Sequence, residues 1–398
     1  MKTKRILISV LAIFLLFTLV SCGATPLPAP ATPTEIKAMK ADEKTSLTCL
    51  YLAREKHDYT ADSIWIDPKK EELLLYESEQ RERLLSLERD MNIALEPYPI
   101  SQESGTLWEF AKTMLDLQDS TVDLVLHPYD TPIPTEMTKH FVKTSELLTE
   151  NGSAILGSLA ATDPYSVTGK FSLSAISEEV VLFMNLALLE NESALKDLPA
   201  LIAQGSFTFE EFVKLAKLPL SDGKAPLVTT KEELTHCLVA AFSAKTDDDR
   251  SVQNAIDTLE NEQLAIYESD PAKAFAEGRA LFVFAPLADA TRVFSHMFED
   301  IAALPLPKSI QSEPTYHAIY SKKLDSASIS RYSEKKELAA ATLAYLGYHE
   351  NEIFDAFFRD LYACRCNCIR KEIWQKTAKV YETNCIFRLI ALDKGEKG

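Results

Sequence analysis

Three closely spaced cysteines near the carboxyl end are the residues best suited by type and spacing to carry chemistry. Cys364, Cys366 and Cys368 alternate with Arg and Asn, and Cys385 follows further along the chain. On a strand the three thiols would share one face, and together with Cys385 they could supply four zinc ligands. On a helix only Cys364 and Cys368 would share a face. Zinc sites usually have two residues between paired cysteines, so we expect free thiols, with a disulfide or a metal site as alternatives.

Motifs for nucleophilic, phosphate or metal chemistry are sparse elsewhere. The sequence contains no Gly-x-Ser-x-Gly, no His-Glu-x-x-His and no P-loop pattern. Two Ser-x-x-Lys matches, at Ser193 and Ser333, lack the Ser-Asp-Asn and Lys-Thr-Gly companions of penicillin-binding enzymes. The seven histidines are scattered, and residues 247–249 lack the alternating ligand spacing of a calcium loop. The sequence therefore predicts a protein that is not an enzyme and that needs no cofactor.

The amino end carries the pattern of an export signal followed by a cysteine. A basic start precedes an apolar run from Ile6 to Val20, which is short of the roughly 20 residues that a membrane-spanning helix needs. Val20 and Ser21 directly before Cys22 resemble a bacterial lipobox. The resemblance implies a signal peptide at 1–21, cleavage before Cys22, and acyl chains such as palmitate on that residue. We therefore expect a lipid anchor on the extracellular side of the cell membrane, with a plain signal peptide and a chance cysteine as the alternative.

The chain beyond the signal divides by composition into a tether and a globular body. Residues 22–44 are rich in Pro and Thr, and Gly23 to Pro33 is expected to form an extended spacer reaching roughly 30 to 40 Å. The chain carries 42 basic and 59 acidic residues, a net charge of −17, which argues against a nucleic-acid partner. With 46% hydrophobic and 25% charged residues, the sequence predicts a soluble globular body long enough for two domains.

Hydrophobic periodicity predicts alternating strands and helices in the first part of the body. This alternation is typical of a parallel sheet with helices on its faces. The expected strands are Ser46–Leu52, Ile93–Leu95 and Val122–Leu126, and the expected helices are Lys70–Asp90 and Trp108–Leu117.

The second part is predicted to be richer in helix. Thr208 and Thr230 each stand three residues before a Glu, which is the pattern of a helix-capping box. The expected strands are Phe171–Ile176, Val180–Met184, Leu281–Phe284 and Ile301–Pro307, and the expected helices include Arg250–Tyr267, Asp289–Phe298 and Glu337–Leu346.

Several short motifs in this second part carry a family resemblance. Phe275-Ala-Glu-Gly278-Arg279 runs into a strand, an acidic pair follows at Glu299 and Asp300, and Leu304-Pro-Leu-Pro-Lys308 precedes Tyr316. Upstream, Val181-Leu-Phe-Met-Asn185 and Gly205-Ser-Phe207-Thr208 follow in the same order. These motifs resemble those of the extracellular solute-binding proteins of ABC importers. The resemblance is to the carbohydrate-type, family 1-like lipoprotein branch of low-GC Gram-positive bacteria.

The resemblance implies a two-lobed α/β fold of the type II periplasmic-binding-protein architecture. Each lobe would be a mixed, mostly parallel sheet flanked by helices, with a small polar solute such as a sugar or oligosaccharide held between the lobes. Lobe 1 is expected to combine 45–150 with about 275–330, and lobe 2 about 151–274 with about 331–398. The implied partners are the solute and the transmembrane subunits of an ABC permease. A degenerate binding-protein fold that acts as a surface sensor or adaptor without transport is the alternative.

Aromatic and amide side chains near predicted strand ends are the candidate ligand contacts, because open α/β sheets bind ligands there. Core packing is the competing interpretation for each of them, including Trp108 on its helix. Two candidates bear on the resemblance: Asn185 matches the family's Asn, although Leu186 replaces the Lys that follows it, and Phe207 replaces a family Trp. Ala285-Pro286-Leu287 stands where many members have Gly-x-Trp. The ligand-binding candidates are Trp65, Tyr165, Asn185, Phe207 and Tyr316.

Overall fold

The computed structural model describes most of the chain from Pro28 onward. It covers residues 28–53, 64–66, 71–101, 106–189, 195–349 apart from 221–222, 245, 248, 298, 311, 314 and 322–323, and then 353, 355–357, 359–360 and 385–388. The predicted modification site Cys22 and the cysteines at 364, 366 and 368 lie outside these residues, and Cys385 begins the last strand. Cys49 and Cys237 are buried free thiols.

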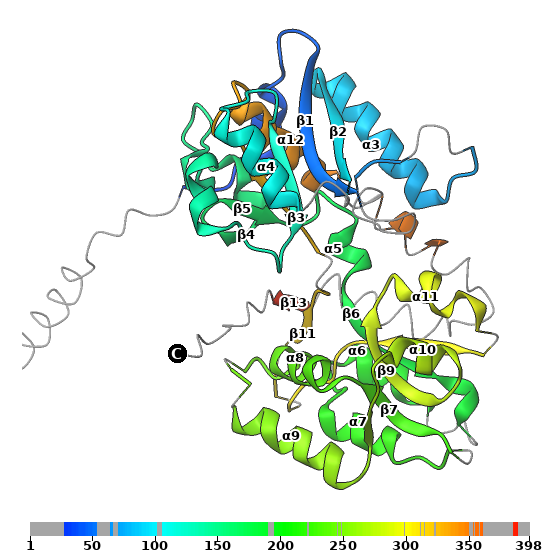
Figure 1. The fold of residues 1–398 in the computed structure, drawn as a ribbon. Helices are drawn as coiled ribbons and strands as arrows, with labels where there is room; N and C mark the ends of the chain where they lie inside the picture. Colours follow the sequence, from blue (N-terminus) through cyan, green and yellow to red (C-terminus); the bar gives the residue numbers. More distant parts are fainter. Residues whose placement is uncertain are drawn as a thin grey trace, which may run out of the picture.

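Lobe 1 is built on a six-stranded sheet in the order β2-β1-β3-β12-β5-β4 (Figure 1). Side chains alternate between its faces: Leu124 and Leu126 enter one core cluster with α12, whereas Val125 enters another with α4. The strands are β1 Thr45–Ala53, β2 Ile93–Ser101, β3 Leu124–Pro128, β4 Ala160–Asp163, β5 Ser166–Thr168 and β12 Asp325–Ile329, and the helices are α2 Pro33–Ala38, α3 Leu75–Met91, α4 Leu107–Asp116 and α12 Lys336–Tyr348.

Lobe 2 is built on a five-stranded sheet in the order β10-β6-β9-β7-β8, again with a core cluster on each face. A separate parallel pair, β11 Tyr316–Ile319 and β13 Cys385–Arg388, lies beside α8. The strands of the main sheet are β6 Val180–Asn185, β7 Ala225–Thr229, β8 Ala265–Tyr267, β9 Ala280–Pro286 and β10 Ile301–Leu304, and the helices are α6 Leu198–Ala203, α7 Phe209–Ala216, α8 Lys231–Ala241, α9 Arg250–Asn261, α10 Pro271–Ala276 and α11 Asp289–Arg292.

These two helix-flanked sheets confirm the expected two-lobed α/β fold. The sheets are mixed: the parallel pairings are β1 with β2 and β3, and β7 with β8 and β9, whereas the other pairings in both sheets are antiparallel. Strands β12 and β6, which follow the connections between the lobes, take part in all of these antiparallel pairings except that of β4 with β5.

The lobe boundaries differ from those expected. Strands β9 and β10 pair with β6, so residues 275–304 belong to lobe 2, whereas helix α12 packs on lobe 1. The first connection runs from Thr168 to Val180 and contains the short helix α5, Ser174–Ser177, and the second lies between Ile319 and Asp325. A third carries the chain from Tyr348 in lobe 1 to Ile353, which packs in the lobe 2 core.

Two predicted segments change structural type. Phe171–Ile176 was expected as a strand, but it leads into α5, where the serines bond to other groups of the connection. The predicted helix Arg250–Tyr267 ends at Asn261, because Gln263 adopts a left-handed conformation with φ 57° and the chain then forms β8. Strand β8 has only three residues and follows α9 closely, so it is too short to interrupt the helical periodicity that predicts a helix up to Tyr267.

Residues 28–41 were expected to belong to a free tether, but they lie folded on lobe 1. Ala31 is 1% exposed and Ile36 is fully buried, and α2 packs against α12. We call residues 28–41 the strap. Among the described residues, no helix combines the length and the apolar character needed to cross a bilayer.

Candidate functional site

The connections between the lobes meet the carboxyl ends of strands from both sheets. Pro128, the last residue of β3, pairs with Asp325 directly after the second connection, and Pro286, the last residue of β9, pairs with Val180 directly after the first. The backbone amides of Tyr129 and Leu287 then bond to carbonyls of these connections. Because ligands of open α/β sheets bind at the carboxyl ends of strands, we take this interlobe region as the candidate site.

Glu178 joins the two connections at their lobe 2 end. Its carboxylate accepts a hydrogen bond from Arg292 Nη2 of α11 at 2.6 Å and another from the Ser321 hydroxyl on the second connection. The Ser321 amide also bonds to the Glu178 carbonyl at 2.7 Å. The Glu178 and Arg292 side chains are only 2% and 11% exposed, so this ion pair is desolvated and geometrically constrained.

Asp325 joins the same connections at their lobe 1 end. Its carboxylate accepts a hydrogen bond from Ser172 Oγ at 2.5 Å, and its amide donates to Ser174 Oγ at 2.9 Å. The Thr168 hydroxyl donates to the Asp325 carbonyl at 2.6 Å. Two buried carboxylates, one from each connection, therefore hold the connections together, and we call this set of contacts the hinge.

Arg83 of α3 fixes the base of the hinge to lobe 1. Its guanidinium donates to the carbonyls of Lys170 and Phe171 on the first connection and to the carbonyl of Leu346 near the end of α12. One side chain thus binds the first connection and the helix that leads into the third. The base of the hinge is rigidly held by lobe 1, whereas its other end contacts α11 of lobe 2.

Glu179 is a buried carboxyl group in the hinge. Its side chain is 4% exposed, and no hydrogen-bond partner for Oε2 lies among the described residues. Burial raises the pKa of Glu179 well above its usual range, although the charge of Lys170 acts in the opposite direction. Burial thus favours the protonated, neutral form of Glu179, which costs less to bury than the carboxylate does.

The lobe 1 side of the site contains Trp108, His127 and Tyr129. The Trp108 indole lies 5.0 Å from the His127 ring between centroids, and its Nε1 has no hydrogen-bond partner within the described part of the chain. Burial lowers the pKa of His127 and raises that of Tyr129. Tyr129 remains partly exposed at the end of β3, so it offers a hydroxyl at this edge.

His127 and two serines form a set of contacts that a hydrolase could use, but their burial gives them a structural role. His127 Nε2 lies 3.2 Å from Ser328 Oγ and 3.3 Å from Ser166 Oγ, whereas Nδ1 faces the Pro128 carbonyl at 3.1 Å. His127 and both serines are at most 1% exposed. This network therefore links β3, β5 and β12 inside the lobe and offers no accessible nucleophile.

The lobe 2 side of the site is acidic. Thr230 caps α8 directly after β7, and its hydroxyl accepts a hydrogen bond from the Glu233 amide at 3.0 Å. Burial, with a further contribution from the charge of Asp289 at the start of α11, raises the pKa of Glu233 to about 7. Glu233, which follows β7, and Asp289, which follows the neighbouring strand β9, thus interact at this edge. With a pKa of about 7, Glu233 exchanges its proton near neutral pH.

Three of the sequence-predicted contacts lie in the lobe 2 core. Asn185, Phe207 and Tyr316 are fully buried. The Tyr316 hydroxyl accepts a hydrogen bond from the Phe207 amide at 3.2 Å, and Asn185 Oδ1 accepts one from the Ala187 amide at 3.1 Å. The structure brings Phe207 and Tyr316 together as packing partners within one lobe, away from solvent.

The two other predicted contacts are partly buried in lobe 1. Trp65 stacks on Tyr51 with 5.5 Å between ring centroids and donates from Nε1 to the Leu95 carbonyl at 3.0 Å. Tyr165 lies in the turn between β4 and β5 and packs against the core cluster that contains Trp108. The five predicted residues are therefore distributed over both lobes and do not form one group.

The hinge carboxylates were missed because their partners are far away in sequence. Glu178 and Ser321 are separated by 143 positions, and Ser172 and Asp325 by 153. The pair Glu178-Glu179 directly before an apolar strand was the one local signal, because acidic residues are seldom placed at the start of a buried strand. In the sequence, the only local pattern that contains Glu233 is the capping box that begins at Thr230.

Within the described ranges, no three His, Cys, Asp or Glu side chains are grouped so that they could hold a metal ion. The predicted thiol cluster is outside this statement, because three of its four cysteines are not described.

The arrangement defines a two-lobed α/β protein with a polar hinge, and this class can be compared with known proteins. No protein-family model matches the chain, and no curated protein matches it. Solved structures do resemble it at low sequence identity. The ABC substrate-binding protein Lmo0181 from Listeria monocytogenes, in complex with cycloalternan, is 12% identical, with a TM-score of 0.47 over 87% of this chain and 89% of that one.

Two further structures show a similar extent of likeness. The apo form of RafE from Streptococcus pneumoniae is 14% identical, with a TM-score of 0.48 over 80% of each chain. The maltose/maltodextrin-binding domain MalE from Bdellovibrio bacteriovorus, bound to maltotriose, is 13% identical, with a TM-score of 0.44 over 85% of this chain and 88% of that one. Of these three structures, Lmo0181 is named as an ABC substrate-binding protein, the class that the sequence motifs resemble.

Proposed function

We propose that this protein is a lipid-anchored, extracytoplasmic solute-binding protein that delivers a small polar solute to an ABC permease. The observation that carries the proposal is the hinge, in which two connections bonded through Glu178 and Asp325 join sheets whose strand ends both reach the interlobe region. Such a joint allows two rigid lobes to close on a ligand. The lipobox-like sequence before Cys22 supports the anchor and the extracellular location.

A sugar or oligosaccharide is the first solute class to test. Polar groups at both edges, including the Tyr129 hydroxyl and the Glu233 carboxyl, can bond to hydroxyl-rich ligands, and carboxylates are strong acceptors for sugar hydroxyls. The carbohydrate-type resemblance of the sequence motifs supports the same choice. Delivery to a permease is part of the proposal because those motifs resemble the ones found in importer components.

A thermal-shift screen of the chain from Gly23 onward tests solute binding. Sugars, oligosaccharides, amino acids and peptides are added separately, and a bound solute at a hundredfold its Kd should add about 2.7 kcal/mol to the free energy of unfolding. For a protein of this size that stabilisation raises Tm by several degrees. The proposal of solute binding fails if no compound in any class raises Tm.

A surface sensor or adaptor is the second candidate function. One observation favours it: Asn185, Phe207 and Tyr316, the predicted contacts in lobe 2, are fully buried and cannot reach a solute in this arrangement. An adaptor would remain acylated and exported but would show no stabilisation in the screen. Recovery of permease subunits after cross-linking in membranes would favour transport, whereas recovery of a sensor kinase would favour the adaptor.

A further inference from the structure

Helix α3 of lobe 1 contacts lobe 2 with its first turn. Tyr76 packs against the lobe 2 core cluster that contains Ile353 and Phe357, which are 3% and 5% exposed. The Tyr76 and Phe357 rings meet edge to face, with 5.6 Å between their centroids and 68° between their planes. In Figure 1 the described part of residues 353–360, drawn in orange, lies between the start of α3 and lobe 2. The lobes are therefore joined here by side chains as well as by the chain itself.

Asp360 caps the start of α3 from a distant part of the sequence. The N-cap residue is Leu74, whose side chain makes no capping hydrogen bond. Asp360 Oδ2 instead accepts a hydrogen bond from the Tyr76 amide at 2.8 Å, across 284 positions. Amides in the first turn of a helix have no partner within the helix, and they favour a nearby carboxylate. Because Asp360 is only 6% exposed, water does not readily replace it.

Phe357 and Asp360 act from the same side of one helical segment. Both residues are helical and lie three positions apart, which places their side chains on one helix face. One of them packs on the Tyr76 ring and the other bonds to the Tyr76 amide. The ring contact and the cap therefore form or break together.

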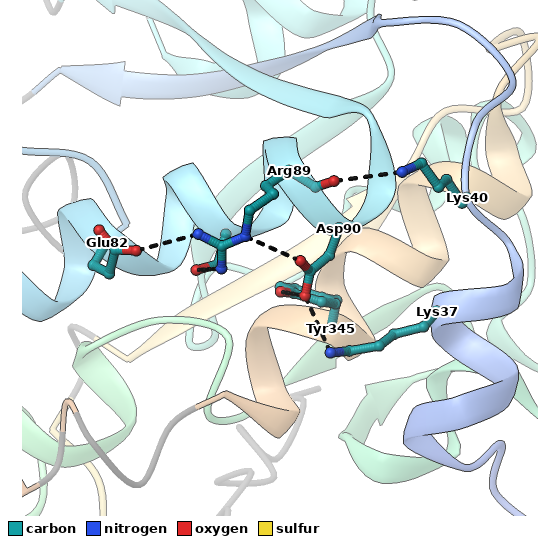
Figure 2. A network of polar contacts seen from close by, with 7 residues as sticks. Lys37, Lys40, Glu82, Arg89, Asp90 and Tyr345 are labelled. Atoms are coloured by element: carbon teal, nitrogen blue, oxygen red, sulfur yellow. Dashed lines mark hydrogen bonds and ion pairs between the residues drawn. The ribbon is translucent and has the colours of Figure 1, made fainter.

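The other end of α3 is fixed to lobe 1 by a polar network (Figure 2). Asp90 accepts hydrogen bonds from Lys37 of the strap at 3.1 Å and from the Tyr345 hydroxyl of α12 at 3.0 Å. Lys40 donates to the Arg89 carbonyl at 3.4 Å. The strap, α3 and α12 are thus held as one body at this end.

The middle of α3 is fixed to the base of the hinge. Arg83, which donates to two carbonyls of the first connection, lies seven residues after Tyr76, a distance of about 10 Å along a helix. Leu87 and Met91 are fully buried in the lobe 1 core cluster. Helix α3 is therefore a rigid arm of lobe 1, and residues that pack in lobe 2 hold its first turn.

We infer that the contacts of Phe357 and Asp360 with the first turn of α3, which we call the latch, hold the lobes in the observed arrangement and open when the lobes rotate about the hinge. An amide hydrogen bond keeps its strength only between about 2.7 and 3.2 Å. Because the latch lies on a rigid arm beyond the hinge base, rotation of one lobe against the other moves Tyr76 out of this range from Asp360. The latch therefore favours one arrangement of the lobes over the others.

The latch goes beyond the proposed function, because a solute-binding protein and an adaptor would both be controlled by it. A solute that binds best in another arrangement has to open the latch, and this reduces its apparent affinity. A solute that binds best in the observed arrangement gains affinity from the latch. The latch thus acts on affinity through the lobes and needs no contact with the solute.

Distances between spin labels on the two lobes test the latch in the full-length protein. The labels are attached through azido amino acids at Thr113 on α4 and Asn254 on α9, which are both exposed. Without solute, the natural chain should give one narrow distribution of distances. Asp360→Ala should increase the population outside this distribution at least about threefold, because a hydrogen bond to a charged group is lost from that arrangement. Tyr76→Ala removes the ring contact at a partly exposed residue and should act in the same direction.

Two further variants separate a latch from a purely structural cap. Asp249→Ala removes the same side chain from the cap of α9, where Asp249 Oδ1 accepts from the Ser251 amide at 2.9 Å within lobe 2. It should lower Tm and leave the distances unchanged. Asp360→Asn keeps an oxygen that can accept from the Tyr76 amide and should restore the narrow distribution.

The distances decide the inference independently of any solute. Natural distances in folded Asp360→Ala and Tyr76→Ala chains overturn it, and so does equal broadening in Asp249→Ala. Failure of the thermal-shift screen would end the proposal of solute binding and leave the latch in place.

Discussion

The hydroxyl of Tyr316 is bonded inside lobe 2, which allows a structural role to be separated from ligand binding. It accepts a hydrogen bond from the Phe207 amide at 3.2 Å and lies 3.5 Å from the Ile202 carbonyl. We expect Tyr316→Phe to lower the free energy of unfolding by about 1–3 kcal/mol, because the Phe207 amide loses its partner while buried. Urea unfolding measures this change.

The control for Tyr316 is Tyr98→Phe, since Tyr98 is 43% exposed and should tolerate the loss of its hydroxyl. Affinity for a solute found in the screen should be the same in both variants. A large loss of affinity in Tyr316→Phe, without a loss of stability, would show that the side chain reaches the solute after all.

Glu233 makes stability depend on pH between its unfolded and folded pKa values. Its pKa rises from 4.5 to about 7 on folding, so the native state holds the proton more tightly than the unfolded chain does. The resulting stabilisation is fully present below pH 4.5 and is lost as pH rises through about 7. The full loss amounts to about 3 kcal/mol at 1.36 kcal/mol per pKa unit.

Glu233→Gln removes this titration and isolates it from that of other carboxyl groups. The difference in unfolding free energy between Glu233→Gln and the natural chain should shift in favour of the variant from pH 4.5 to pH 8. Glu210→Gln is the matched control, because Glu210 also lies in the first turn of a helix but is 80% exposed. A difference that stays constant with pH would contradict the assignment.

For single residues, hydrogen bonds to near neighbours in the sequence could be predicted, whereas bonds between residues far apart in the sequence could not. Thr208 and Thr230 were recognised as helix caps, and both hydroxyls accept the predicted hydrogen bond from the third residue of their helices. A cap is determined by residues within one turn. The bonds of Glu178 and Asp325 depend on how the whole chain returns to the hinge, which no short window of sequence contains.

Among the elements, the strap contradicts what its composition suggests. A Pro-rich segment favours extended structure, yet Ile36 and Ala31 supply enough apolar contact to dock it on α12. We expect a chain that begins at Asp42 to be less stable than one that begins at Pro28 by about 2–5 kcal/mol, because removing a buried Ile side chain alone has an effect of this size.

Urea unfolding of the two truncated chains measures the contribution of the strap. The chain that begins at Pro28 should match the full mature chain. Exchange of the Ala31 amide with deuterium provides a second readout, since its bond to the Ala154 carbonyl should protect it in the longer chain. Equal stability of both truncated chains would show that the strap is a passive spacer.

Element type was predictable where periodicity was long and failed where it was short. The helix α3 and the strands β1, β6 and β9 were all anticipated within a few residues. The segment 171–176 was misassigned because its alternating serines suggest a strand, whereas in the structure Ser172 and Ser174 bond to Asp325. Tertiary hydrogen bonds thus overrode the local pattern there.

For the whole molecule, the ion pair between Glu178 and Arg292 is the contact most sensitive to how the lobes are joined. We expect Arg292→Met to lower the free energy of unfolding by about 3–5 kcal/mol, because it leaves the Glu178 carboxylate buried without its counter-ion. The double variant Glu178→Gln/Arg292→Met should lose less than the sum of the single variants.

A double-mutant cycle measures that coupling, and Lys214→Met serves as the control because Lys214 pairs with Glu210 at the surface. The surface variant should change stability by less than about 1 kcal/mol. Additive losses from the two hinge variants would show that the pair does not act as a unit. Solute affinity should change in the hinge variants as well, since they alter the equilibrium between open and closed lobes.

The two-lobed fold was predictable from motif order, but the division of the chain between the lobes was not. Residues 275–304 were expected in lobe 1, yet β9 and β10 pair with β6 in lobe 2. Which strands pair is decided by contacts across the whole sheet. The order of strands in the sequence therefore does not say which lobe a strand joins after the chain has crossed between the lobes. The position of the hinge therefore could not be predicted from the sequence.

The number of connections has a practical consequence. The strap begins in lobe 1, whereas β13 pairs with β11 in lobe 2, so the described start and end of the chain belong to opposite lobes. A fluorescent protein inserted after Ala24 and a second one fused to the carboxyl end would therefore be attached to opposite lobes. The efficiency of energy transfer between the two fluorescent proteins would report the opening and closing of the lobes in living cells. No residue of either lobe would have to be substituted.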